Sequence, residues 1–214
     1  MKPGKCFSGI ILLINLTLSA QYSNVQIGGP LNAWSPNEPS VNINPMNPDE
    51  IVVGANIDNS YFSVDGGITW QHEVMISSYG VNCDPVIVAD TSGNFYYFHL
   101  VPDLSRLVCQ KKEGILSPWS DGTFTAYDDH KDIDKEWATF DPVTGNLYVS
   151  WGRFDLHGST SNLDSSFIFM SKSTDGGMTW GDQKLLSNIG GNSQGGTLSV
   201  HGSCPATGPN GEVY

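Results

Sequence analysis

The residues best suited to chemistry are acids placed at the starts of short apolar segments. Glu38, Asp84 and Glu136 each lie at or just before such a start. If several strand starts meet, these carboxyls could work in pairs, one donating a proton while another acts as base or nucleophile. That arrangement is the chemistry of glycosidic bond hydrolysis. The alternative is structural, because acids at strand starts also accept backbone hydrogen bonds or are simply solvated. We treat these three residues as catalytic candidates.

Three further residues are candidates for substrate binding. Trp137 offers a ring that could stack on a sugar, although packing between sheets is the commoner use of a tryptophan. Arg153 follows the expected strand at 147–151 and could receive a carboxylate, or it could pair with Asp155 or another acid of the chain. His201 precedes the last apolar segment.

The densest acidic segment, 128–136, contains a candidate cation site. In an extended strand alternate residues project to one side, so Asp132, Asp134 and Glu136 would present three oxygen donors together. Calcium prefers such ligands, and it is the one cofactor that the sequence indicates. The alternative is a solvated charged loop whose interleaved lysines neutralise the acids.

An internal repeat indicates the elements that must position these residues. SVDGGITW at 63–70 recurs as STDGGMTW at 173–180, with six of eight positions identical. In this SxDGGxTW turn the aspartate can accept backbone N–H bonds, the glycines permit positive φ, and the tryptophan can pack between sheets. We expect structural roles for Ser63, Asp65, Gly67, Thr69, Trp70, Ser173, Asp175, Gly177, Thr179 and Trp180.

A second pattern divides the chain into units of four strands. Turns containing glycine lead into aromatic and β-branched segments at 90–97, 141–149 and 209–214, and each follows a short apolar run. In the second unit, 117–122 (SPWSDG) takes the place of the SxDGGxTW turn. Four-stranded units of roughly 40–55 residues are typical of β-propeller blades, whereas an eight-stranded sandwich leaves the repeated turn unexplained. We predict an all-β propeller with four-stranded blades at about 36–78, 79–130 and 131–190, and a partial blade at 201–214.

The sequence reaches Tyr214 inside the second strand of the fourth unit. Three and a half blades cannot close a ring, for which about 4–8 blades are typical. We therefore expect this chain to be the N-terminal part of a longer propeller. The alternative is a complete short protein that closes through a partner chain.

Residues 1–20 have the pattern of a secretory signal peptide. Two lysines precede an apolar stretch within 6–18, and Ser19 and Ala20 supply small residues for cleavage. The stretch is shorter than the roughly 20 residues that span a bilayer. We expect a secreted, cell-surface or periplasmic protein. Three cysteines remain beyond this segment, Cys83, Cys109 and Cys204, as one bridge with one leftover or as free thiols.

The composition excludes several classes of partner. Lys and Arg number 10 against 22 Asp and Glu, giving a formal net charge of -12. Nucleic acids and anionic membrane surfaces need basic footprints, so neither is expected as a partner. The 24 glycines and 12 prolines argue against a helical bundle. The oligomeric state is left open.

The two SxDGGxTW turns resemble the Asp-box (BNR) repeat of sialidases and related secreted β-propellers. The resemblance covers about residues 36–214, and the phrases NEPSVNINP, DKEWATFDPVTGNLYVSW and GSCPATGPNGEVY are similar to bacterial sialidase-like proteins. It implies a propeller directed at carbohydrate or glycoprotein. Such a protein would be an exo-acting glycoside hydrolase, sialidase being the named member, or a non-catalytic propeller for glycan binding, protein binding or adhesion.

The sialidase resemblance also implies a clamp of three arginines for the substrate carboxylate, a Tyr–Glu nucleophile and an aspartate as acid and base. This sequence has two arginines, Arg106 and Arg153. Residues 21–45 hold none, and NEPSV stands where those enzymes carry an Arg-Ile-Pro type motif. The arginine triad therefore cannot be assembled within this chain.

Overall fold

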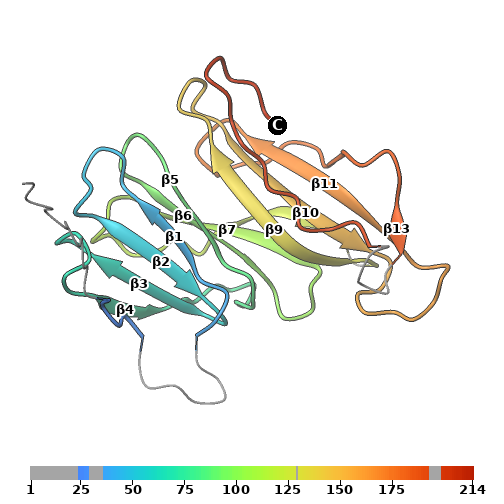
Figure 1. The fold of residues 1–214 in the computed structure, drawn as a ribbon, viewed down its shortest axis with the longest axis horizontal. Helices are drawn as coiled ribbons and strands as arrows, with labels where there is room; N and C mark the ends of the chain where they lie inside the picture. The colour runs from blue at the N-terminus through green and yellow to red at the C-terminus, as the bar shows by residue number, and fades with distance from the viewer. Residues whose placement is uncertain (1–23, 29–35, 129, 193–198) are drawn as a thin grey trace, which may run out of the picture.

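The computed structural model describes residues 24–28, 36–128, 130–192 and 199–214, and within them it contains thirteen strands and no helix (Figure 1). The all-β prediction is confirmed. The expected signal peptide at 1–20 lies outside the described residues. No helix that could cross a membrane is found in the part of the chain that the structure describes.

Twelve of the described strands form three antiparallel sheets of four strands, each connected in chain order as a meander. The first sheet consists of β1 (Ser40–Ile43), β2 (Ile51–Ala55), β3 (Asn59–Ser63) and β4 (Gln71–Val74). The second consists of β5 (Val86–Ala89), β6 (Phe95–Leu100), β7 (Arg106–Lys112) and β8 (Thr123–Tyr127). The third consists of β9 (Asp132–Phe140), β10 (Leu147–Phe154), β11 (Ser165–Ser173) and β12 (Lys184–Leu185), and β13 (Gly191–Asn192) also pairs with β11. Within the described residues these sheets do not close into a ring, so the propeller stays a prediction.

The second sheet is buried on both faces. All six residues of β6 are buried, and side chains of a strand alternate between the two faces of its sheet. Phe95 and Tyr97 belong to an apolar cluster shared with the first sheet. Tyr96, Phe98 and Leu100 belong to a cluster shared with the third. A strand that is buried at every position therefore requires a sheet on each side.

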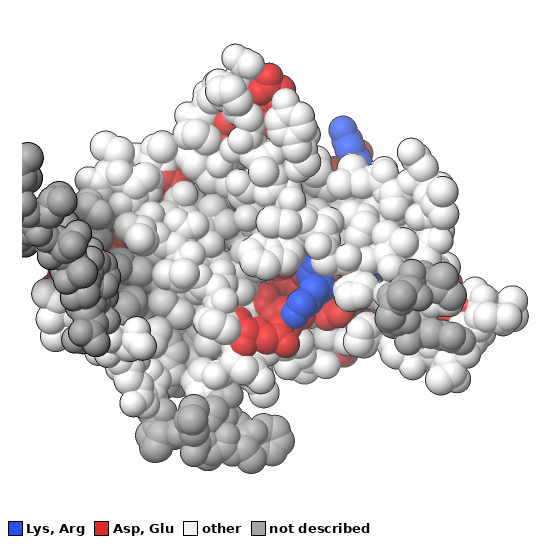
Figure 2. All heavy atoms as spheres, in the orientation of Figure 1, with Lys and Arg blue, Asp and Glu red and all other residues white. Residues whose placement is uncertain are grey.

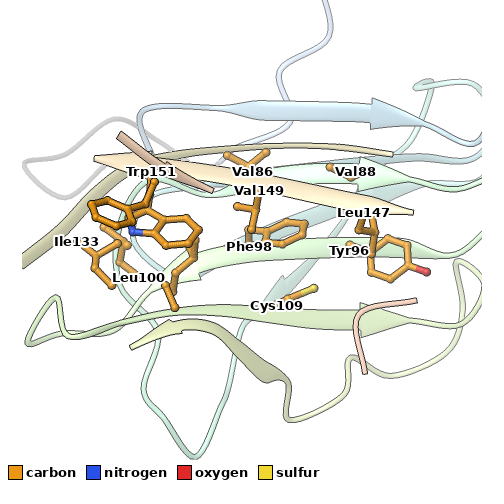
Figure 3. Close-up of a cluster of buried hydrophobic side chains, with 13 residues drawn as sticks. Val86, Val88, Tyr96, Phe98, Leu100, Cys109, Ile133, Leu147, Val149 and Trp151 are labelled. Atoms are coloured by element: carbon orange, nitrogen blue, oxygen red, sulfur yellow. The ribbon is translucent and has the colours of Figure 1, made fainter. Parts of the chain in front are cut away.

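The larger cluster lies between the second and third sheets (Figure 3). Trp151 of β10 is fully buried in it and stacks on Phe169 of β11, with ring centroids 6.4 Å apart and an interplanar angle of 21°. Leu100 and Leu107 from the second sheet, and Ile133 from the third, are also fully buried in this cluster.

The first strands of the three sheets are neighbours, with β5 between β1 and β9. Side chains of β1 bond to the backbone of β5: the Ile87 amide donates to Ser40 Oγ at 2.9 Å, and Asn42 Nδ2 donates to the Ile87 carbonyl at 3.3 Å. This adjacency brings the starts of the three strands together.

The last described segment, 199–214, begins a further hairpin beside the third sheet. The Ala206 and Tyr214 backbones exchange hydrogen bonds of 3.0 and 2.9 Å. Ser203 Oγ donates to Ser150 Oγ of β10 at 2.8 Å, and Thr207 Oγ1 donates to the Phe140 carbonyl of β9 at 3.5 Å. This hairpin thus stands next to β9 as β5 stands next to β1.

The two SxDGGxTW turns connect the third and fourth strands of their sheets, β3 to β4 and β11 to β12. In the first copy Asp65 Oδ1 accepts from the Thr69 amide at 2.8 Å, and Asp65 Oδ2 accepts from Thr69 Oγ1 at 2.6 Å. Ser63 Oγ donates to the same carboxylate and accepts from the Gly67 amide. Gly67 has φ +87°, a conformation that other residues rarely adopt.

The second copy repeats this network. Asp175 Oδ1 accepts from the Thr179 amide at 2.9 Å, Asp175 Oδ2 accepts from Thr179 Oγ1 at 2.5 Å, and Ser173 Oγ accepts from the Gly177 amide. The turn is therefore built by hydrogen bonds among its own residues.

The tryptophans of these turns differ in their packing. Trp180 reaches the second sheet, where its ring meets Phe98 edge-on and its Nε1 donates to Thr123 Oγ1 at 3.1 Å. Trp119, in the turn at 117–122, likewise reaches the first sheet and donates to Glu73 at 3.1 Å. Trp70 departs from the expected packing between sheets, because its Nε1 donates to the Gly67 carbonyl of its own turn.

Replacing Asp65 or Asp175 with alanine should lower the melting temperature at pH 7. Hydrogen bonds to the ionised carboxylates hold both pKa values at about 2, below their ordinary 3.8. A depressed carboxyl pKa stabilises the fold above the unfolded pKa, and this stabilisation disappears as pH falls toward the folded value. The difference from wild type should therefore shrink between pH 4 and pH 2 in thermal unfolding. Asp182→Ala, at an exposed aspartate, is the control. A difference in melting temperature between variant and wild type that persists at pH 2 would contradict a stabilising role of the ionised carboxylates.

Replacing Trp151 with alanine should destabilise the fold by about 3–5 kcal/mol, the range for truncating a buried tryptophan. The cost arises because a fully buried ring between two sheets is lost. Urea unfolding measures the change. Leu163→Ala, at a side chain 87% exposed, should change stability by less than about 0.5 kcal/mol. Equal effects of the two substitutions would show that the cluster between the sheets does not carry the stability.

Candidate functional site

The same backbone conformation recurs at the start of each first strand. In each of the four units, one residue lies six positions before the turn that begins at Asn44, Asp90, Asp141 or Gly208. This residue has a positive φ every time: 48° at Glu38, 59° at Asp84, 53° at Lys135 and 76° at Gly202. A positive φ costs energy for any residue except glycine, and such strain concentrates at functional sites. Three charged side chains occupy these positions in the first three sheets.

Asn56, on the loop between β2 and β3, ties two of these starts together. Its amide donates to the Asn37 carbonyl at 2.9 Å, and its Oδ1 accepts from the Asp84 amide at 2.6 Å. The backbones that carry Glu38 and Asp84 are therefore held by one residue.

The third start is shaped by a β-bulge in β9. Asp134 pairs with Gly152 and Trp137 pairs with Ser150, so Lys135 and Glu136 together oppose one residue of β10. The extra residue breaks the alternation of side chains along β9 and leaves Glu136 buried.

The bulge overturns the expected calcium ligands. Asp132 Oδ2 accepts from the His157 amide at 2.7 Å, and Asp134 Oδ2 lies 3.2 Å from His157 Nε2, whereas Glu136 lines a pocket elsewhere. The alternation of Asp132, Asp134 and Glu136 that we expected was wrong, because a bulge shifts the phase of a strand. Across the described ranges no group of three or more His, Cys, Asp or Glu side chains is arranged to hold a metal.

The starts of β1 and β5 and the bulge in the middle of β9 enclose a pocket of about 250 Å³. All three catalytic candidates line it, together with one substrate-binding candidate, Trp137, which is 42% exposed. The complete lining is Glu38, Pro39, Ser40, Asp84, Pro85, Val86, Lys135, Glu136 and Trp137.

Lys135 joins two acids of this pocket. Its Nζ lies 2.5 Å from Glu38 Oε2 and 3.4 Å from Asp84 Oδ2. Figure 2 shows acidic side chains gathered around a basic one near the middle of the face viewed. Hydrogen bonds from Asp84 and Lys135 hold the pKa of Glu38 below its ordinary value. Burial, followed by the hydrogen bond to Glu38, raises the pKa of Asp84 to about 7. Of the two acids, Asp84 thus holds the proton and Glu38 the charge.

Glu136 is the least solvated acid of the pocket. It is 2% exposed, and neither carboxyl oxygen finds a hydrogen-bond partner in another described residue. Burial raises its pKa well above the ordinary value, and the nearby charges of Asp84 and Asp134 raise it further. These causes favour the protonated form of Glu136.

The other two substrate-binding candidates lie outside the pocket. The Arg153 guanidinium lies 3.6 Å from the centroid of the Phe169 ring, and its Nη1 is 3.6 Å from Asp128 Oδ2. The alternative of a structural ion pair thus describes it, with Asp128 rather than Asp155 as partner. His201 lies beside Phe154, with ring centroids 6.0 Å apart.

The sequence analysis treated Lys135 as one of the lysines that neutralise the acidic run and assigned it no role in catalysis or binding. Its signal was positional: Lys135 precedes Asp141 by six residues, as Asp84 precedes Asp90. The three cysteines beyond the expected signal peptide are free thiols, Cys109 buried, Cys83 partly buried and Cys204 exposed.

Comparison with known proteins identifies no family: no family model matches the chain, and no curated protein matches it significantly. The function must therefore be inferred from the geometry of the pocket.

The raised pKa of Asp84 predicts a specific pH dependence of stability. An acid whose folded pKa exceeds its unfolded pKa stabilises the fold at low pH, and this stabilisation is lost as pH rises toward about 7. Asp84→Asn, which cannot ionise, should therefore gain stability relative to wild type between pH 4.5 and pH 8. Urea unfolding midpoints at these two pH values measure the gain. Asp182→Asn should show no such gain, and a pH-independent difference for Asp84→Asn would refute the assignment.

Proposed function

We propose that the described sheets are blades of an exported Asp-box β-propeller directed at carbohydrate, and that the pocket between the starts of β1 and β5 and the bulge of β9 cleaves a glycosidic bond. The observation that carries the proposal is the pair formed by Asp84 and Glu38, two carboxyls from different sheets that line one pocket and whose pKa values are shifted in opposite directions. Pairs of acids whose environments separate their pKa values mark the proton donor and its ionised partner in hydrolases.

The arrangement of the sheets supports the propeller part of the proposal. Three four-stranded meanders follow one another, their first strands are neighbours, and a further hairpin begins beside β9. Propeller blades have this strand order around a central channel. Tryptophans of two equivalent turns reach back to the preceding sheet, Trp119 to the first and Trp180 to the second.

In this mechanism Asp84 donates its proton to the oxygen of the leaving group. Glu38, kept ionised by Lys135 at 2.5 Å, acts as the base or nucleophile, and bound substrate must first break its hydrogen bond with Asp84 to separate the two carboxyls by about 5 Å or more. Trp137, exposed at the pocket, provides a face for stacking on a sugar ring. The volume of about 250 Å³ is below the roughly 300–1,000 Å³ of pockets for drug-sized ligands, so a single sugar ring suits it.

Within this class the pocket favours substrates other than sialosides. Neither arginine lines it, since Arg106 lies 4.6 Å from the Tyr127 ring centroid and Arg153 lies over Phe169. A substrate carboxylate would meet Lys135, which already pairs with two acids.

A non-catalytic propeller that binds glycan or glycoprotein is the second candidate. The ion pairs of Lys135 with Glu38 and Asp84 favour this candidate, because ion pairs across a pocket can stabilise the fold and bind a ligand without any catalysis. The two candidates differ in whether Asp84 and Glu38 act on a bond.

Fluorogenic glycosides of neutral, amino and acidic sugars test the proposal. General acid catalysis contributes typically 10²–10⁴-fold, so Asp84→Asn and Glu38→Gln should each lower kcat at least 100-fold for a cleaved glycoside. Asp182→Asn should retain full activity. Calorimetric titration with the matching free sugars should show binding retained in Asp84→Asn. Binding without cleavage by wild type would favour the binding propeller, and absence of both would overturn the carbohydrate proposal.

A further inference from the structure

The mechanism above leaves Glu136 unused, although it is the most unusual acid of the pocket. Its carboxyl is buried, lines the cavity, and makes no hydrogen bond to another described residue. Buried polar groups normally find partners, and one left unsatisfied destabilises the fold. A buried acid without a partner at the wall of a cavity points to a ligand that supplies the missing donor.

The charges of the pocket define the kind of donor. Among its lining residues Glu38, Asp84 and Glu136 are acids, and Lys135 is the single base. Lys135 is occupied by two of the acids, at 2.5 and 3.4 Å. An anionic ligand would therefore find no uncommitted cation among these lining residues, whereas a cationic ligand would favour the ionised forms of Asp84 and Glu136.

Trp137 adds a second feature that suits a cation. It follows Glu136 in β9, lines the same pocket and is 42% exposed. The face of an indole ring attracts ammonium groups. A carboxyl and an indole at one cavity wall can together bind an ammonium that donates to the former and packs against the latter.

We infer that the pocket selects a ligand carrying a protonated amino group, with Glu136 as the residue that binds it. This inference rests on the proposed function, and the substrate class is then a glycoside of an amino sugar whose amine is free. The ammonium donates to Glu136, which releases its own proton to solvent, and a charge-assisted hydrogen bond of this kind is about twice as strong as a neutral one. Acetylation of the amine removes its positive charge and therefore the charge-assisted hydrogen bond to Glu136.

Isothermal titration of the chain with matched methyl glycosides tests the inference. The ligands are the amino, N-acetylamino and hydroxyl forms of the same sugar, in the gluco and galacto series and in both anomers. The amino form should bind wild type at least 10-fold more tightly than either other form. Glu136→Gln, which keeps the shape of the side chain, should reduce this preference to less than 3-fold.

The matched control is Glu113→Gln, at a glutamate whose side chain is 75% exposed outside this pocket, and it should keep the full preference. Circular dichroism confirms the fold of each variant. If Glu136→Gln does not fold, the comparison of amino and N-acetylamino ligands on wild type still decides the inference. Equal binding of the two overturns it.

Propylamine separates this inference from the proposed function. Neutral sugars that bind as tightly as amino sugars, with no effect of Glu136→Gln, overturn the inference and leave the carbohydrate function standing. Propylamine binding that depends on Glu136, with no sugar bound or cleaved, supports the amine site and overturns the carbohydrate function. If neither sugars nor propylamine bind, both proposals fail.

Discussion

The rest of this structure depends on the burial of the second sheet on both faces. A strand such as β6, whose six residues are all buried, cannot lie at the surface of a protein. Its alternating side chains must be covered twice, by the first sheet around Phe95 and Tyr97 and by the third around Phe98 and Leu100. This requirement places three sheets in succession with the second in the middle. Each outer sheet then has one neighbour within the described part of the chain.

The pocket is a consequence of that stacking. Packing three meanders face to face makes their first strands neighbours, so the starts of β1, β5 and β9 meet. The positive φ values at Glu38, Asp84 and Lys135 are energetically unfavourable locally. They are held by the surrounding structure, as in the hydrogen bond from the Asp84 amide to Asn56 Oδ1. Strained residues at equivalent positions thus direct charged side chains into one cavity.

Two lysines connect sheets in this acidic protein, and their surroundings give them different roles. Lys112 is 1% exposed, and its Nζ lies 2.9 Å from both carboxylate oxygens of Glu73 on the first sheet, near the rings of Phe62 and Trp119. Breaking this ion pair by removing Glu73 would be strongly destabilising, because the charge of the buried Lys112 would be left without a partner. Lys135 makes its contacts at a pocket, where Glu38 and Asp84 differ in protonation. The first pair is suited to fastening sheets, and the second to binding and proton transfer.

The sequence alone was sufficient for the β-class, the four-strand units and the turns. Alternating and apolar segments predict strands by themselves, and the hydrogen bonds of SxDGGxTW lie almost entirely within eight residues. It also identified the acids of the pocket, because Glu38, Asp84 and Glu136 occupy strand starts that recur along the chain. The contacts between different sheets could not be predicted from the sequence. Only the tertiary structure decided that Lys135 pairs with Glu38, 97 positions away, that Arg153 lies over Phe169, and that the bulge at Lys135 and Glu136 breaks the alternation of Glu136 with Asp132 and Asp134. The physical reason is that turns and strand periodicity are set by neighbouring residues, whereas the direction and protonation of a side chain depend on which sheets pack around it.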